Sequence, residues 1–311
     1  MPVVEERLKQ LFWDAQRKTE LDAAALELWE MKQALQQELA QRARETAREQ
    51  KDVEALEGRS LKGLLLGLTG KKEEALKKHR REAMEAKVDQ EIAVLELANV
   101  ANKLEHIMDQ QRKLGDCQEA FWEQFPAVYG AYRNAGEGDQ HYAQELEMQM
   151  IVAAKQDKEV REALAAGQKA RASVERVLKC LKEVRAGEEE ALAPGSVAVR
   201  GMIVRAQEEV NAMRDSLCTF KEELLDVQMP SELRFDLHGF LQLEDDYLIR
   251  RSGSTNITEQ YNRITVLLHP ALQQLDAILP YLELMMEKSH LQLQQARLSL
   301  GQYVLEELDE I

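Results

Sequence analysis

Apolar residues recur at every third or fourth position over most of the chain, with charged residues or glutamine between them. From residue 4 to residue 56 this stripe consists of Leu8, Leu11, Ala15, Leu21, Ala25, Leu28, Leu35, Leu39, Ala43 and Ala47. From 71 to 114 it consists of Leu76, Ala83, Val88, Ile92, Leu95, Val100, Leu104, Ile107 and Met108. Such spacing is typical of amphipathic helices. Because neither helix can bury its stripe alone, residues 1–114 are predicted to form a coiled-coil-like antiparallel hairpin with its tip at about 58–70.

The rest of the chain is also predicted to be helical. Residues 115–139 form an aromatic-rich connector, whose rings either pack against a helical layer or form a recognition pocket. Residues 140–311 are predicted to form a bundle of long helices, interrupted by an irregular segment at 229–256. Pro270 and Pro280 fall within the last helical pattern, where we expect kinks or a break. The predicted fold is therefore all-α, with a long hairpin followed by a helical bundle.

Composition and charge support this interpretation and exclude some functions. Hydrophobic residues make up 44% of the 311-residue chain, so a folded protein is expected. The formal net charge of −15 disfavours binding to nucleic acid, because phosphate backbones are also negative. No apolar run approaches the roughly 20 residues that span a bilayer. Three widely separated cysteines predict reduced thiols, and the first segment, MPVVEERLKQ, has acidic residues where a secretory signal would be basic, with no apolar run after it. Both features predict a cytoplasmic protein.

The stretch GLLLGLTGKKEEAL, residues 63–76, could be read as a phosphate-binding loop, a membrane contact or a helix bend. A phosphate-binding loop would need glycine in place of Leu65 and serine or threonine in place of Lys72, so this interpretation fails. As a bend, the stretch would close the apolar core between the two arms of the hairpin. As a membrane contact, the leucines of 61–68 would enter the headgroup region beside basic residues. Between Arg59 and Arg81 there are eight basic and two acidic residues, a net charge of +6.

These features define a candidate interaction tip of apolar and basic side chains. Its residues are Leu61, Leu64, Leu65, Leu66, Leu68, Lys71, Lys72, Lys77, Lys78, Arg80 and Arg81. Whether this tip contacts a membrane, contacts a protein or only closes the hairpin stays open at this point.

The segment SLKGLLLGLTGKKEEALKK, residues 60–78, resembles the hairpin tip of uncharacterised bacterial α-helical coiled-coil proteins. The resemblance implies a coiled-coil hairpin and a bacterial origin. It implies no activity, cofactor or functional residue.

Candidate chemistry elsewhere is sparse. Glu287-Lys-Ser-His290 has the Glu-x-x-His spacing of di-iron bundles, but no other histidine has glutamate three residues before it. Glu105, His106 and Asp109 form another weak group, for which exposed hydrogen bonding is the simpler interpretation. No motif marks a nucleophile with its base. We therefore predict no catalytic residue, cofactor or metal site.

The functional prediction follows from the long helical surfaces. We expect a non-enzymatic scaffold or protein–protein interaction protein that binds protein partners, or itself, through helical faces. The alternative is a peripheral membrane-binding protein that uses residues 61–68 and the adjacent basic cluster on an anionic surface. No small-molecule substrate is evident, and nucleic acid is not an expected partner.

Overall fold

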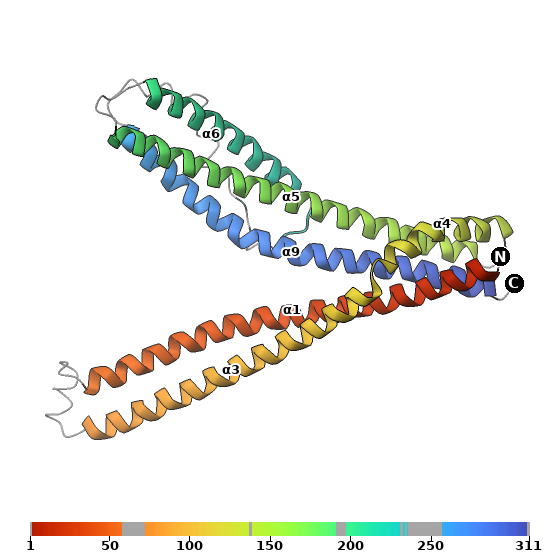
Figure 1. The fold of residues 1–311 in the computed structure, drawn as a ribbon, viewed down its shortest axis with the longest axis horizontal. Coiled ribbons are helices and arrows are strands. Elements are labelled where there is room, and N and C mark those ends of the chain that lie inside the picture. The colour runs from red at the N-terminus through yellow and green to blue at the C-terminus, as the bar shows by residue number, and fades with distance from the viewer. Residues whose placement is uncertain are drawn as a thin grey trace. The chain divides into compact units, whose positions relative to one another are not determined.

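The computed structural model of the chain describes residues 2–57, 72–136, 139–190, 197–230, 233, 235 and 257–309, and these residues contain helices and no strands (Figure 1). The helices are α1 (Pro2–Glu57), α3 (Lys72–Leu114), α4 (Cys117–Ala135), α5 (Gln140–Glu190), α6 (Val197–Glu223) and α9 (Ile257–Asp309). The all-α prediction is confirmed. The tip at 58–70 lies outside the described residues.

The chain divides into two compact units. The first unit comprises Met1–Glu137 with Val304–Ile311, and the second comprises Gly138–Tyr303. The first unit therefore contains α1, α3 and α4, and the second contains α5, α6 and most of α9.

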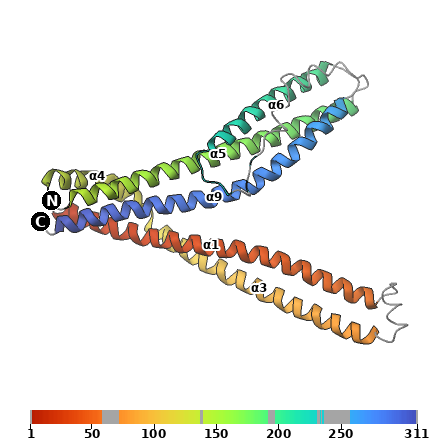
Figure 2. The same ribbon diagram turned by 180° about the vertical axis from the view of Figure 1, so that it is seen from behind.

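Helices α1 and α3 form the predicted antiparallel hairpin and lie side by side from the front and from behind (Figure 2). On α3, the buried or half-buried residues Ala86, Ala93, Val100 and Ile107 repeat every seven positions. This repeat is typical of left-handed coiled coils, in which a 3.5-residue period keeps one face turned toward the partner helix. The face that each helix turns toward the other is called the seam below. On α1 it includes Leu35, Leu39, Arg42, Thr46, Glu49, Val53 and Leu56, which are all buried or half-buried.

Several seam positions on α1 are polar, and they bond across to α3. Arg42 Nη1 donates a hydrogen bond of 2.9 Å to the carbonyl oxygen of Asp89, and Thr46 Oγ1 lies 3.2 Å from the carbonyl oxygen of Ala86. A slip of one helix along the other would break both contacts, although Thr46 would keep its 2.9 Å bond to the carbonyl oxygen of Arg42, and Arg42 its bonds to Glu38. The polar seam residues therefore help to set the register of the hairpin.

The aromatic segment forms helix α4, which packs against the beginning of α1. Phe121 and Phe125 are buried, and the Phe121 ring lies 5.6 Å from that of Phe12 on α1. Gln118 Nε2 donates to Thr19 Oγ1 at 2.9 Å, again joining α4 to α1. These rings pack within a helical layer, which is the first of the two roles considered for the aromatic-rich connector.

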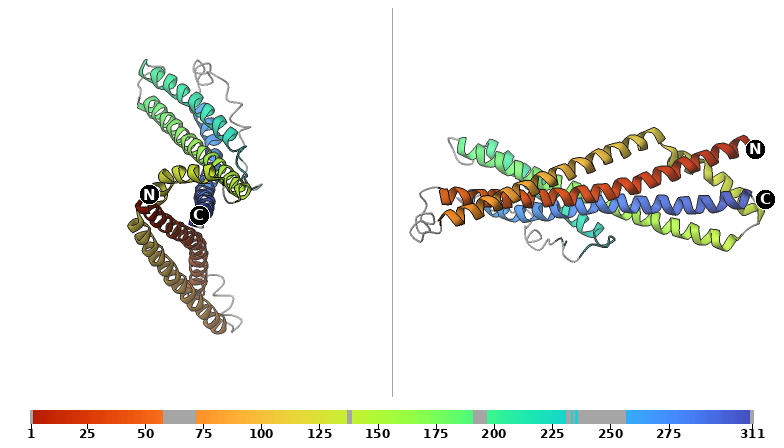
Figure 3. Two further views of the ribbon diagram at one scale, coloured as in Figure 1. Left: turned by 90° about the vertical axis from the view of Figure 1, so that its right-hand side faces the viewer. Right: turned by 90° about the horizontal axis from the view of Figure 1, so that it is seen from below.

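The second unit buries one apolar core between α5, α6 and α9, and Figure 3 shows the ribbon from two further directions. At Gly167 of α5, an added Cβ would lie only 2.7 Å from atoms of both Phe220 on α6 and Leu279 on α9. The absence of a side chain at this position therefore allows three helices to approach closely. Helix α9 continues through Pro270 and Pro280, so of the two outcomes expected there, kinks or a break, the break does not occur.

Candidate interaction surface

Helix α3 carries a second apolar stripe that does not face α1. Met84, Val88, Ile92 and Leu95 are exposed to 71%, 46%, 45% and 70% of their full surface. Single exposed apolar residues are normal in proteins, but a row of them along one helix is the feature that marks an interaction site. These four residues are called the outer stripe below.

The spacing of the outer stripe places it on one side of α3. Its members follow one another at intervals of four, four and three residues. Each residue advances the helix by about 100°, so these intervals keep the side chains in one row. By the same geometry, Met84, Val88 and Leu95 lie roughly opposite the seam residues Ala86 and Ala93. The outer stripe is therefore available to a helix other than α1.

This finding corrects one detail of the sequence interpretation. Ala83, Val100, Leu104 and Ile107 lie at half-buried or buried positions, as expected for the seam. The prediction that Val88, Ile92, Leu95 and Met108 belong to the same stripe is wrong, because all four are exposed. The apolar pattern in the sequence combined residues from two faces of α3, one that packs against α1 and one that is exposed.

The charges beside the outer stripe are mainly negative. Between Arg81 and Asn99 there are five carboxylates and two basic residues, Arg81 and Lys87. Leaving out Glu82, which lies on the seam side near His79, the net charge is −2. The carboxylates are Glu82, Glu85, Asp89, Glu91 and Glu96. A helix that packs on this stripe with basic residues along its flanks would be favoured electrostatically.

Only part of the predicted interaction tip falls within the described residues. Leu61, Leu64, Leu65, Leu66, Leu68 and Lys71 lie outside them, and Lys72 is described only as the first residue of α3. Lys77, Lys78, Arg80 and Arg81 lie in the first turns of α3.

Three of these basic side chains form ion pairs. Arg80 contacts Glu57 Oε1 through Nε at 3.1 Å and Nη2 at 2.5 Å, which joins the two arms of the hairpin. Lys78 lies 3.6 Å from Glu82, and Arg81 Nε lies 2.8 Å from Glu85. The count of charges between 59 and 81 did not include these three carboxylates. Their pairing reduces the positive charge that would attract an anionic membrane.

His290 belongs to a polar cluster between α5 and α9. Asp157 is buried and accepts hydrogen bonds from Arg161 Nε at 2.7 Å and from Ser289 Oγ at 3.2 Å. Arg161 Nη2 lies 3.0 Å from Nδ1 of His290. Because a guanidinium group only donates, this nitrogen of His290 accepts. The Ser289 hydroxyl has acceptors in Asp157 at 3.2 Å and in the carbonyl oxygen of Met286 at 3.0 Å, and it does not bond to His290. The geometry is therefore not that of a nucleophile paired with its base.

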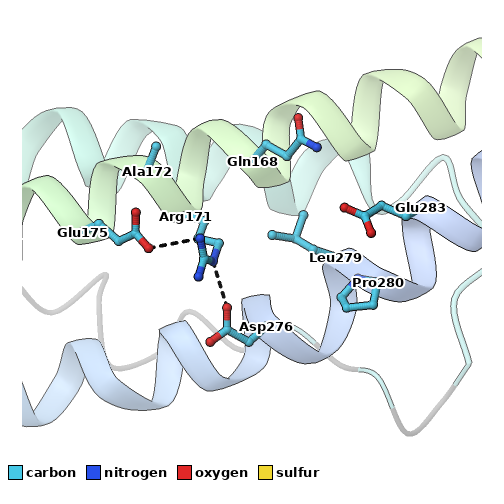
Figure 4. Close-up of a pocket in the computed structure, with 8 residues that line it drawn as sticks. All are labelled: Gln168, Arg171, Ala172, Glu175, Asp276, Leu279, Pro280 and Glu283. Carbon is cyan, nitrogen blue, oxygen red and sulfur yellow. Dashed lines mark hydrogen bonds and ion pairs between the residues drawn. The ribbon is translucent and has the colours of Figure 1, made fainter. Parts of the chain in front are cut away.

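A shallow hollow elsewhere on this unit is lined from α5 and α9 (Figure 4). Arg171 lies at its centre and pairs with Asp276 at 2.8 Å and Glu175 at 3.1 Å. Leu279 and Pro280 form its apolar side. Because the guanidinium group of Arg171 is already bonded to two carboxylates, the hollow offers little positive charge to an anionic ligand.

Comparisons of the chain with protein-family models, with curated proteins and with solved structures found no match. None of the described helices contains a stretch long and apolar enough to cross a membrane.

Proposed function

We propose that this protein is a non-enzymatic helical interaction protein, and that the outer stripe binds an amphipathic helix with basic flanks on a partner protein. The observation that carries the proposal is the row of exposed apolar side chains on α3 opposite the α1 seam. A third helix packed on this row would use the same side-chain interdigitation that joins α1 to α3.

Charge favours a different protein over a second copy of this chain. Two outer stripes packed on one another would bring acidic flanks together, and like charges across a helical interface are unfavourable. A partner with lysine or arginine beside its apolar face would neutralise the net charge of −2 around the outer stripe.

The size of the outer stripe predicts a transient complex. It covers about three helical turns, which is a small contact compared with the interfaces of permanent complexes. We therefore expect a dissociation constant on the order of 1–100 μM, which suits reversible assembly on a scaffold. We also place the protein in the cytoplasm, because all three of its cysteines are free thiols.

Designed peptides test the proposal with the full-length protein. Two labelled amphipathic peptides would have the same leucine face, one with lysine and the other with glutamate along its flanks. We expect fluorescence anisotropy to detect binding of the lysine peptide only. The variant Val88→Asp/Leu95→Asp should weaken that binding at least about tenfold, because two charges would then lie in the apolar contact.

A matched control separates the outer stripe from the overall charge. Met31→Asp/Val266→Asp adds the same two charges at apolar residues that are 52% and 69% exposed, outside α3. This control should bind the lysine peptide at least as well as the wild type. If both double variants bind equally, the outer stripe is not the binding surface.

A further inference from the structure

The seam of the hairpin contains a polar group close to the ends of its two arms. Glu49 lies on α1 and His79 on α3, and both occupy seam positions of their helices. Glu82 lies one turn after His79 on the same side of α3. Seam positions of a coiled coil are normally apolar, so an acid and a histidine facing each other there need an explanation.

The three side chains point potential metal-binding atoms at one another. His79 Nδ1 lies 3.1 Å from Glu82 Oε2 and 3.5 Å from Glu49 Oε2, and the three atoms lie within 4.8 Å of one another. Glu49 Oε2 and His79 Nδ1 are shut off from solvent, yet neither makes a hydrogen bond. Buried polar atoms are normally hydrogen-bonded. These two instead face each other and Glu82 Oε2 at ion-pair distances, without forming a regular hydrogen bond.

We infer that Glu49, His79 and Glu82 form a binding site for a divalent transition-metal ion, of which Zn²⁺ is the best fit. Zinc binds imidazole nitrogen and carboxylate oxygen at about 2.0–2.2 Å, so two ligands of a tetrahedral site lie roughly 3.3–3.5 Å apart. The separation of 3.5 Å between His79 and Glu49 falls within this range, and the 3.1 Å between His79 and Glu82 is slightly shorter. Two carboxylates balance the charge of one divalent cation, and the fourth position is left to a water molecule.

The donor set distinguishes zinc from the harder cations. Mg²⁺ and Ca²⁺ prefer sites made of oxygen atoms, whereas imidazole suits zinc and its neighbours in the first transition series. The other oxygen of Glu82 lies 3.6 Å from Lys78 Nζ, so an outer partner helps to orient this carboxylate.

The ion would join the two arms of the hairpin. One ligand comes from α1, eight residues before its end at Glu57, and two come from the first turns of α3. Binding to the folded hairpin alone would stabilise the contact between the arms beside residues 58–71. Because the seam and the outer stripe are on different sides of α3, this site is independent of the proposed partner surface.

Zinc titration of the full-length protein, first freed of metal by a chelator, tests the inference. With a competing colorimetric indicator, we expect one zinc ion per chain. His79→Gln, Glu49→Gln and Glu82→Gln should each weaken this binding at least about tenfold, because even groups that only orient metal ligands have effects of 10- to 100-fold. The glutamate-to-glutamine changes keep the side-chain size, and circular dichroism would confirm that each variant stays helical.

His106→Gln is the matched control, because His106 is an exposed histidine of the same helix with Gln110 as its neighbour at 2.7 Å. It should bind zinc like the wild type. Zinc should also slow hydrogen exchange in peptides that contain Glu49 or His79 in the wild type and not in His79→Gln. The inference is overturned if the wild type binds no zinc, if His79→Gln binds as tightly as His106→Gln, or if Mg²⁺ competes equally with zinc. In each of these cases the three side chains simply contact one another, without a metal ion between them.

Discussion

Replacing Gly167 with alanine should destabilise the second unit, whereas the same change at Gly201 should stabilise it. Both glycines lie within helices of that unit, Gly167 in α5 and Gly201 in α6. An added Cβ at Gly201 would meet no atom within 4 Å, whereas at Gly167 it would lie 2.7 Å from both Phe220 Cε2 and Leu279 Cδ2.

The magnitudes follow from two opposing effects. Alanine is favoured over glycine by about 0.5–1 kcal/mol inside a helix, because it restricts the unfolded chain. At Gly201 this is the whole effect. At Gly167 the new methyl group lies roughly 1 Å closer than van der Waals contact at about 3.5–4.0 Å. Overpacking of this kind costs about 1–3 kcal/mol, so Gly167→Ala should be destabilising by up to about 2 kcal/mol.

Urea unfolding followed by far-ultraviolet circular dichroism measures both effects. The tryptophans Trp13, Trp29 and Trp122 all belong to the first unit, so their fluorescence provides an internal reference for that unit. Shortening Leu279 to alanine removes one of the two crowded atoms, so Gly167→Ala should cost less in that background, by at least about 0.5 kcal/mol. If Gly167→Ala stabilises the protein as much as Gly201→Ala, then α5 does not approach α6 and α9 as closely as described.

Two further predictions concern the first unit and the thiols. Phe121→Ala should lower the free energy of unfolding by about 3–5 kcal/mol in tryptophan-detected urea titrations, because a buried ring between α4 and α1 is lost. Met31→Ala, at an exposed position, should change it by less than about 0.5 kcal/mol. Equal effects would contradict the packing of α4 on α1. Burial raises the pKa of the Cys117 and Cys180 thiols, so the folded chain holds these protons more tightly than the unfolded chain. The free energy of unfolding should therefore fall as pH rises above about 8.5. In the variant Cys117→Ala/Cys180→Ala it should fall less steeply with pH. If it falls equally steeply in that variant, the pH dependence does not come from these thiols.

Much of the fold could be predicted from the sequence because helical spacing is a local property. Two periodic arms around one glycine-containing link were sufficient to predict the antiparallel hairpin of α1 and α3. The prolines of α9 were less informative, because packing against α5 and α6 keeps a helix continuous through residues that would interrupt an isolated one.

The two sides of α3 could not be separated by looking for large apolar residues. Its seam contains Ala86 and Ala93, which are small, whereas Val88 and Leu95 on the other side are larger and dominated the pattern. Counting strictly in steps of seven from Val100 would have identified the alanines as seam residues. The group of Glu49, His79 and Glu82 depends on the register of the hairpin, because its members are brought together from two helices. The search for Glu-x-x-His within one helix had no means of finding it.

The most direct measurement for the central claim is photocrosslinking from the outer stripe in cells of the source organism. A photoreactive phenylalanine analogue would replace Leu95, or Met31 as the control, and the adducts would be mapped by mass spectrometry. The account predicts an adduct from position 95, absent from position 31, on the apolar face of a helical segment flanked by lysine or arginine in another protein. Adducts at position 95 that map only to lipid or to this chain, or that equal those from position 31, would contradict it.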